Sequence, residues 1–304
     1  MSTQHQKEYV IGVDAGGTRV HAVAYAADGC AIAQSTAPAA NLAADFSSAV
    51  QHILQAVDAL IAQCGTPCFA LLGCAGAETG DCAQRLHDAL SARYAFPIRI
   101  ESDARLAYRA AFGEEDGILV IAGTGSIAYR GCGDGFRRSG GWGHLIGDGG
   151  SGYDIAMRAI RHVTALADRD LAADALQTTL LAAIDARSTG ELVAFVYRAT
   201  KADIAALCPV VTNCAAAGCK AAQDILRAAG VALANTVRAL LKESDKCTSV
   251  RLALCGSVLC HVTPVREAML RSLEGEGFML CPLTDTPDPT YGAYRAHMRA
   301  TPFF

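Results

Sequence analysis

The stretch YVIGVDAGGTRVHAVAYAADG, residues 9–29, decides the fold of this chain. Its β-branched and aromatic runs predict strands at 9–14 and 19–26, joined by a glycine-rich turn, and a further turn leads into a third strand at 30–34. Glycine permits positive φ angles and lets a backbone approach a ligand closely. The amides of such a turn, with the Thr18 hydroxyl beside them, form a concavity suited to phosphate oxygens. An ordinary hairpin has the same local pattern, so neighbouring motifs must decide.

The same pattern returns once, at residues 118–139, with Gly123-Thr124-Gly125-Ser126 as its turn and Gly133-Asp134-Gly135 before its third strand. An internal duplication is stronger evidence than either turn alone. Between the two copies, residues 113–117 (GEEDG) are polar and bounded by glycines, which indicates a domain boundary. We therefore expect two hairpins that face each other across a cleft and hold a polyphosphate.

Composition excludes several classes of protein. The 304 residues are 52% hydrophobic and carry a net charge of −4, without a basic stripe, so we expect no nucleic-acid partner. No apolar signal core and no apolar run of membrane-spanning length occur, which favours a cytoplasmic protein without a membrane partner. The thirteen cysteines are interpreted mainly as small buried apolar residues in a reduced cytosol. Cys64 and Cys68 could bind a metal, but no second pair supports them.

Two aspartates follow predicted strands and are candidates for chemistry. Asp14 ends the first strand and is placed to hold a metal ion, directly or through water, as Mg²⁺ usually is. Asp103 lies between a predicted strand at 98–101 and a predicted helix at 104–112. It could cap that helix, or it could accept a proton from a substrate hydroxyl. The residues alone leave both readings open.

The remaining pattern adds three loops of interest. Asn41 lies in a loop, where asparagine usually forms a turn with its own backbone. The glycine-dense segment 140–152 is long enough to suggest that it lines a site, with His144 expected to donate to a backbone carbonyl and Asp148 either a turn residue or an acceptor for sugar hydroxyls. Gly256-Ser257 follows a predicted strand, where a base or ribose can lie against bare backbone. Further helices are predicted at 45–63, 81–94, 153–167 and 290–299, a mostly helical alanine-rich region at 153–242, and further strands at 68–72 and 250–254.

Several common motifs are absent from the sequence. It contains no Walker-type G-x-x-x-x-G-K-[ST] loop, and no G-x-G-x-x-G follows the first strand. A G-x-S-x-G elbow and an H-E-x-x-H helix are also missing. A dinucleotide-binding fold, a serine hydrolase and a zinc protease are therefore disfavoured.

Five motifs in order resemble the N-acetylglucosamine kinases and their bacterial relatives, within the sugar kinase/actin/heat-shock chaperone superfamily. They are DAGGT at 14–18, ESDAR at 101–105, IAGTGS at 121–126, GGWGHLIGDGGSGYDIA at 140–156 and CGSV at 255–258. The resemblance extends from about residue 10 to about residue 296. It implies an α/β protein with two ribonuclease-H-like (actin-like ATPase) domains around a central cleft for nucleotide and sugar. The expected domains are 1–115, joined by a C-terminal helix at 290–304, and 116–289 with a helical insertion.

The resemblance also assigns roles to residues. It implies Asp103 as the catalytic aspartate, Asp14 near the Mg²⁺, and contacts to ATP and to the sugar from the two turns and three loops. The nucleotide contacts are Gly16, Gly17, Thr18, Gly123, Thr124, Gly125, Gly256 and Ser257, and the sugar contacts are Asn41, Gly143, His144 and Asp148. Relatives suggest a homodimer through the second domain. Gly149, where relatives often have Glu, and a simplified Ala75-Gly76 loop leave the sugar's identity open.

The expected reaction is transfer of the ATP γ-phosphate to the 6-hydroxyl of an amino sugar, foremost N-acetylglucosamine. Glucosamine and N-acetylmuramic acid are alternative substrates. From another class, an iron–sulfur activator ATPase of a dehydratase or reductase shares the fold, and thirteen cysteines keep it open. A sugar-sensing repressor is set aside because too few residues precede the first strand for a helix-turn-helix domain.

Overall fold

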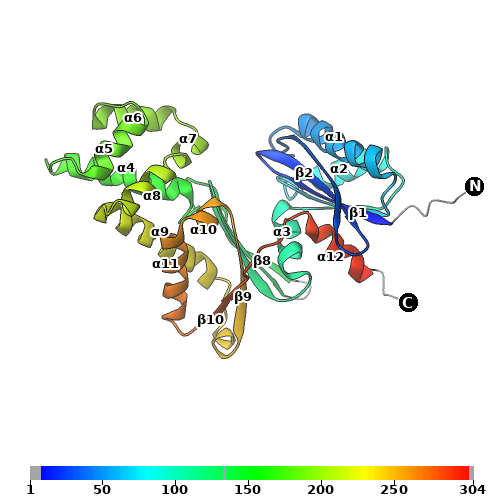
Figure 1. Ribbon diagram of the computed structural model, residues 1–304. Coiled ribbons are helices and arrows are strands. Elements are labelled where there is room, and N and C mark those ends of the chain that lie inside the picture. Colours follow the sequence, from blue (N-terminus) through cyan, green and yellow to red (C-terminus); the bar gives the residue numbers. More distant parts are fainter. Residues whose placement is uncertain (1–7, 133–134, 301–304) are drawn as a thin grey trace, which may run out of the picture. The chain divides into compact units, whose positions relative to one another are not determined.

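The computed structural model describes residues 8–132 and 135–300. The chain divides into two compact units (Figure 1). Unit 1 comprises Met1–Glu115 together with Asp285–Phe304, and unit 2 comprises Asp116–Thr284. The division falls inside the polar segment 113–117. The turn predicted at 133–135 lies partly outside the described residues.

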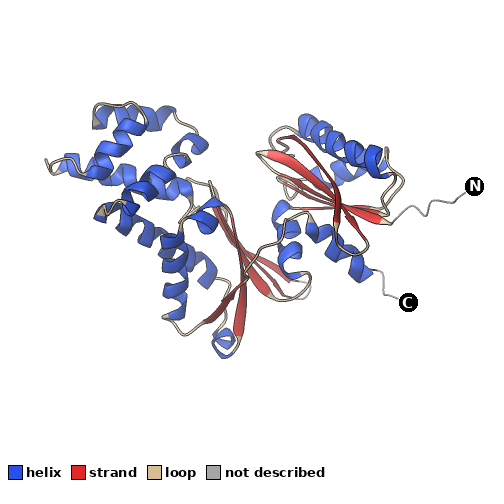
Figure 2. Cartoon of the chain, viewed as in Figure 1, coloured by secondary structure: helices blue, strands red, loops and turns tan. Residues whose placement is uncertain are grey.

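Unit 1 contains a five-stranded sheet with helices on both faces (Figure 2). Its elements are β1 (Tyr9–Ala15), β2 (Arg19–Ala26), β3 (Ala31–Pro38), α1 (Phe46–Cys64), β4 (Phe69–Cys74), α2 (Cys82–Ser91), β5 (Ile98–Glu101), α3 (Asp103–Phe112) and α12 (Tyr291–Ala300). The strand order is β3-β2-β1-β4-β5. Strand β1 pairs antiparallel with β2 and parallel with β4, so it lies at the centre.

The two faces of β1 bury different helices because successive side chains of a strand alternate. Ile11 and Val13 are fully buried in the core that includes α1. The opposite face carries Gly12, and a Cβ there would lie 2.0 Å from the Thr290 carbonyl oxygen. The missing side chain therefore lets the segment before α12 lie directly on the strand. Figure 1 accordingly shows the red α12 beside the blue and cyan elements of unit 1, although α12 is the last helix in the sequence.

Unit 2 repeats this sheet. Its strands are β6 (Gly117–Ala122), β7 (Ser126–Cys132), β8 (Gly135–Gly140), β9 (Ser249–Cys255) and β10 (Met279–Pro282). The order β10-β9-β6-β7-β8 has the same connectivity as unit 1, with β6 antiparallel to β7 and parallel to β9. The duplication inferred from the two glycine–threonine turns is thereby confirmed as a repeated topology.

Helices between β8 and β9 make unit 2 larger than its counterpart. They are α4 (Gly152–Asp168), α5 (Ala175–Ala183), α6 (Thr189–Arg198), α7 (Lys201–Ala205), α8 (Cys208–Ala216), α9 (Lys220–Arg238) and the short 3₁₀ helix η1 (Glu243–Cys247), with α10 (Ser257–His261) and α11 (Thr263–Glu274) following β9. Gly230 lies inside α9, and a Cβ there would lie 2.5 Å from the Val265 carbonyl oxygen. Helices α9 and α11 can therefore pack closely, and one apolar core extends through the unit.

Some expectations need correction. Strand β3 starts after Cys30 and runs four residues past the predicted end at 34, and strand β10 was not expected at all. The interpretation of the cysteines as mainly buried is wrong. Among the twelve with a described side chain, only Cys74, Cys82, Cys208 and Cys214 are buried, and none of the twelve forms a disulfide bond. Within 8–132 and 135–300, no helix combines the length and the apolar character needed to cross a membrane.

Candidate functional site

The first glycine turn, residues 16–18, connects β1 to β2. The Gly16 N–H donates to the Arg19 carbonyl at 3.0 Å, while Gly17 and Thr18 are exposed, and their backbone N–H groups have no partner in the described part of the chain. Neither glycine has a positive φ, so the expectation that this turn needs glycine for its conformation is wrong. A Cβ on Gly17 would meet nothing within 4 Å. The protein itself leaves this space open, as a closely approaching ligand requires.

The loop that carries Asn41 lies beside this turn. The Ala40 N–H donates to the Gly16 carbonyl at 2.9 Å, and Asn41 forms an isolated parallel bridge with Ala75, which follows β4. The Asn41 Oδ1 accepts from the N–H groups of Ala43 and Ala44, at 3.0 and 3.2 Å. This is the local turn that asparagine usually makes. Its Nδ2 has no partner among the described residues and can still donate to a ligand.

Asp14 and Asp103 meet at the same edge of the sheet. Asp14 is paired in register with Gly73 of β4, and a Cβ on Gly73 would lie 3.1 Å from the Asp103 Cα. Glycine at this position therefore lets α3 begin directly against the strand. Burial, followed by the negative charges of Asp103 and Asp288, raises the pKa of Asp14 to about 6. The charges of His21 and Arg19 oppose this shift only in part. Burial and like charge thus disfavour the ionised carboxylate, and a bound cation would relieve this.

Asp103 is the first residue of α3 and not its cap. The N-cap is Ser102, whose hydroxyl donates to the Glu78 Oε1 at 3.0 Å instead of capping the helix. The Asp103 Oδ1 accepts from the Ala104 N–H at 2.9 Å, and the other carboxylate oxygen is left for a ligand. The carboxyl is accessible to solvent but has protein around much of it. This desolvation, with the nearby charge of Glu78, raises its pKa above the ordinary value.

Sequence reasoning missed two residues at this edge, Asp288 and His21. Asp288 precedes α12 and lies 3.4 Å from the His21 Nδ1 of β2, measured to its Oδ2. Its Oδ1 accepts from the backbone and the hydroxyl of Thr290, at 2.9 and 2.5 Å. Only the return of the chain to unit 1 brings Asp288 near Asp14, and no local motif marks that return.

The second glycine turn, residues 123–125, connects β6 to β7 in unit 2. The Gly123 N–H donates to the Gly125 carbonyl at 2.9 Å, and the Gly152 N–H donates to the Gly123 carbonyl at 2.7 Å, so α4 begins against the turn. Thr124 is exposed. The backbone N–H groups of Thr124 and Gly125 donate to no other described residue. This turn, like the first, presents free amides.

A cavity of about 500 Å³ opens beside the second turn, within unit 2. Its volume is within the range of pockets for small ligands and cofactors. The walls come from the turn, the start of α4, the helical insertion and the segment after β9. The lining residues are Gly123, Thr124, Gly152, Ala202, Ala205, Ala206, Cys208, Pro209, Thr212, Ser257, Val258, His261 and Val262. Gly256 has a φ of 86°, and a Cβ there would lie 2.4 Å from the Ala122 carbonyl oxygen. Glycine at 256 therefore lets the chain turn tightly after β9, and Ser257 enters the cavity wall. Pro209, Thr212 and His261 also line the cavity, and no local motif marks them.

The loop between β8 and α4 carries the remaining predicted residues. Gly143 has a φ of 87°, and the His144 ring lies edge-on to the Tyr153 ring at 4.9 Å. No hydrogen bond from His144 to a described residue occurs, so the expected donation to a carbonyl is absent. Trp142 is 63% exposed, with the Arg138 guanidinium 4.1 Å from its ring centre.

Asp148, in the same loop, is buried and engaged on both oxygens. Its Oδ1 accepts from the Ser126 N–H at 3.3 Å, and its Oδ2 accepts from the Lys201 ammonium at 2.7 Å. Its φ of 61° is one of the few positive values at a residue other than glycine. The turn role expected for it is accompanied by an ion pair that the sequence did not reveal, because Lys201 lies in the helical insertion.

Two curated proteins and one solved structure are similar to this chain. An N-acetylmuramic acid/N-acetylglucosamine kinase from Clostridium acetobutylicum is 30% identical over 268 residues, covering 84% of this chain and 87% of that protein. An N-acetyl-D-glucosamine kinase from Dictyostelium discoideum is 27% identical over 216 residues, covering 63% of this chain and 65% of that protein. A Chromobacterium violaceum crystal structure, provisionally named an N-acetylglucosamine kinase, matches with a TM-score of 0.76 and 26% identity, covering 95% of this chain and 98% of that one.

The fold class expected from the sequence is confirmed by this structural match together with the two mixed sheets of the same order. The family model that matches the chain describes ATPases, and it covers residues 11–293. This range includes the two glycine turns, the Gly256-Ser257 segment and Asp103. The protein therefore belongs to the BadF/BadG/BcrA/BcrD ATPase family.

Proposed function

We propose that this protein transfers the γ-phosphate of ATP to a hydroxyl of an amino sugar, foremost the 6-hydroxyl of N-acetylglucosamine. The observation that carries the proposal is in unit 1. A carboxylate of raised pKa, Asp103, lies at the same sheet edge as a glycine turn with free amides and open space. The curated relatives named as amino-sugar kinases support this choice of reaction.

Unit 2 is assigned the nucleotide's base and ribose. The 500 Å³ cavity is lined mainly by small and apolar groups, and the Gly256-Ser257 corner leaves backbone exposed to a ligand. Gly123, Thr124 and Gly125 at its edge offer amides to the phosphates. With adenosine in the cavity, the attached phosphates reach the turn at the edge of that cavity.

Unit 1 is assigned the transferred phosphoryl group and its acceptor. The free amides of Gly17 and Thr18, next to Gly16, bind phosphate oxygens, and Asp14 holds a Mg²⁺ directly or through water. No three acidic, His or Cys side chains in the described residues are arranged to hold a metal, but Mg²⁺ needs only one or two carboxylates when phosphates and waters supply the rest. When bound, Mg²⁺ neutralises negative charge on the phosphates.

Asp103 acts on the acceptor sugar. Its free oxygen accepts a hydrogen bond from the sugar hydroxyl, orients that oxygen toward the γ-phosphorus and takes the proton as the new P–O bond forms. The raised pKa makes the carboxylate a better base than an ordinary aspartate. Asn41, Gly143 and His144 are proposed to bind the sugar, and the free Nδ2 of Asn41 supports its part. Asp148, the fourth residue that the resemblance assigns to the sugar, is left out of this proposal because its two oxygens already accept from Ser126 and Lys201.

The substrate is tested by measuring ADP formation with N-acetylglucosamine, N-acetylmuramic acid, glucosamine and glucose side by side. N-acetylmuramic acid is included because the Clostridium relative is named for both sugars. We expect the highest kcat/KM for N-acetylglucosamine, and loss of turnover with Asp103→Asn. ATP hydrolysis that no sugar accelerates would refute the proposal and favour an activator ATPase. A homodimer, expected from relatives, is checked by light scattering of the purified protein.

A further inference from the structure

Lys201 lies beside the second glycine turn, although it comes from the helical insertion of unit 2. It is the first residue of α7, and its capping residue Thr200 fixes the start of that helix through a capping box with Asp203. A Cβ added to Gly125 would come within 2.9 Å of the Lys201 ammonium. The cation is therefore next to the backbone whose amides are free.

Asp148 holds this ammonium in place. The carboxylate binds the Lys201 Nζ at 2.7 Å and the Ser126 N–H at 3.3 Å, so it connects the lysine to the end of the turn. The Asp148 side chain is 4% exposed, whereas that of Lys201 is 32% exposed. One partner is thus fixed inside the unit, and the other still reaches solvent.

The ammonium has donors to spare. A lysine carries three N–H donors, and Asp148 is the single partner of this one among the residues that the structure describes. Ala202 and Ala205, next along α7, line the cavity together with Gly123 and Thr124. The ammonium therefore lies next to the turn at the edge of the cavity, although Lys201 itself does not line the cavity.

We propose that Lys201, oriented by Asp148, binds the phosphates of the nucleotide as they lie on the Thr124 and Gly125 amides. This inference rests on the proposed function and adds a phosphate-binding residue to it. A fixed cation supplies what amides alone lack, a full positive charge against the polyphosphate. It makes the site prefer ADP and ATP over adenosine, because adenosine occupies the cavity without reaching the ammonium.

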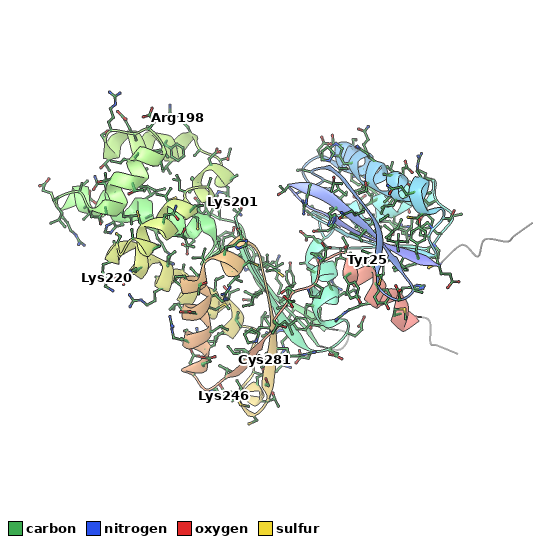
Figure 3. All side chains as sticks on the ribbon, in the orientation of Figure 1. Tyr25, Arg198, Lys201, Lys220, Lys246 and Cys281 are labelled. Atoms are coloured by element: carbon green, nitrogen blue, oxygen red, sulfur yellow. The ribbon has the colours of Figure 1, made fainter. Side chains whose placement is uncertain are left out.

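The test compares nucleotide binding by calorimetry for the whole chain and three variants. Lys201→Gln removes the charge but keeps a donor for Asp148, and Lys201→Met removes both. The control is Lys220→Gln, since Lys220 also pairs with an aspartate, Asp224 at 2.9 Å, but on the outer surface of α9. Figure 3 shows Lys201, Lys220 and Lys246 at three separate places in unit 2, with only Lys201 beside the sheet end where the turn lies.

We expect Lys201→Gln to weaken ADP binding about tenfold to a hundredfold, the usual loss for a hydrogen bond between charged groups, and to change adenosine binding less than about twofold. ADP affinity of the wild type should also fall more steeply with added salt than that of the variant. Lys220→Gln should bind both ligands like the wild type.

Two results overturn the inference. One is unchanged ADP affinity in Lys201→Gln, and the other is an equal loss for ADP and adenosine, which would indicate a damaged cavity. Lys201→Met with thermal unfolding checks this second case, because it leaves Asp148 without its cation and shows how much stability the ion pair supplies. A wild type that binds neither ligand would refute the nucleotide site itself, and with it the proposed function, independently of Lys201.

Discussion

Replacing Asp14 with Asn should stabilise the protein while it removes activity. Asp14 lies on the central strand of unit 1, where burial and the charges of Asp103 and Asp288 oppose its ionisation. Asn has nearly the same shape and carries no charge. In the absence of divalent cations, the substitution removes repulsion that the folded state otherwise has to tolerate.

The size and the sign of the effect follow from the pKa. In the folded protein it is about 6, against an ordinary value of 3.8. At 1.36 kcal/mol per pKa unit, the ionised carboxylate lowers the free energy of unfolding by about 3 kcal/mol at neutral pH. The folded state holds the proton more tightly than the unfolded state, so stability is lost as pH rises from about 4 to about 6 and the loss is complete above that. Asp14→Asn should remove this part of the pH dependence.

Differential scanning calorimetry without divalent cations, at several pH values, measures the effect. At about pH 7.5 we expect the transition of unit 1 to rise by roughly 9 °C, using about 3 °C per kcal/mol for a domain of this size. At about pH 4 the gain should nearly vanish, because the wild-type carboxyl is then protonated. Asp81→Asn, which changes the same charge at an exposed position, is the control.

Two outcomes would refute this reasoning about Asp14. The first is a gain no larger than that of Asp81→Asn. The second is a gain of equal size at both pH values, which would mean that Asn packs better and that charge is not the cause. In either case the carboxylate would not be held in an unfavourable environment awaiting a cation.

Four further substitutions test the assigned roles. Asp103→Asn should lower kcat by roughly 10²–10⁴ with little change in the KM for ATP, and wild-type turnover would remove Asp103 from its role as base. Gly17→Ala should leave the melting temperature within about 1 °C and raise the KM for ATP about tenfold or more, because the added Cβ meets only the ligand's space; an unchanged KM would show that no phosphate approaches there. Gly12→Ala is its contrast and should unfold the protein, since its Cβ would lie 2.0 Å from the Thr290 carbonyl oxygen. Ala206→Trp, at an exposed position in the cavity wall, should weaken adenosine binding about tenfold or more without lowering the melting temperature, and unchanged binding would place adenosine elsewhere.

The sequence predicted the strands around the two turns because local signals specify them. Apolar runs end at glycine, and the same pattern occurs twice, so β1, β2, β6 and β7 were found with their ends within a residue or two. Strand β10 was missed because Met279–Pro282 is short, exposed on one side and ends in proline. Its place depends on pairing with β9, which no local pattern encodes.

The predicted site was incomplete for a related reason. Asp14 and Asp103 follow strands, and strand ends gather at one edge of a parallel pair, so their proximity could be expected. Asp288 and Lys201 come from a proline-rich loop and an alanine-rich helical region, and they reach the turns only through the tertiary fold. The glycines of the first turn do not have the positive φ angles expected of them, because the turn forms with ordinary backbone angles. Their role as nucleotide contacts stays a prediction.

The return of the chain to unit 1 sets an order for folding during synthesis. Unit 2 is continuous in sequence, whereas unit 1 needs Thr290 against Gly12, Tyr25 bonded to Thr290, and Ala293 in its core. A ribosome has therefore released most of unit 1 long before the segment that closes it emerges, and unit 2 can finish first. A partly synthesised chain should therefore expose the face of the unit 1 sheet that Thr290 and Ala293 cover in the complete protein. We expect a chaperone to bind the growing chain on this face.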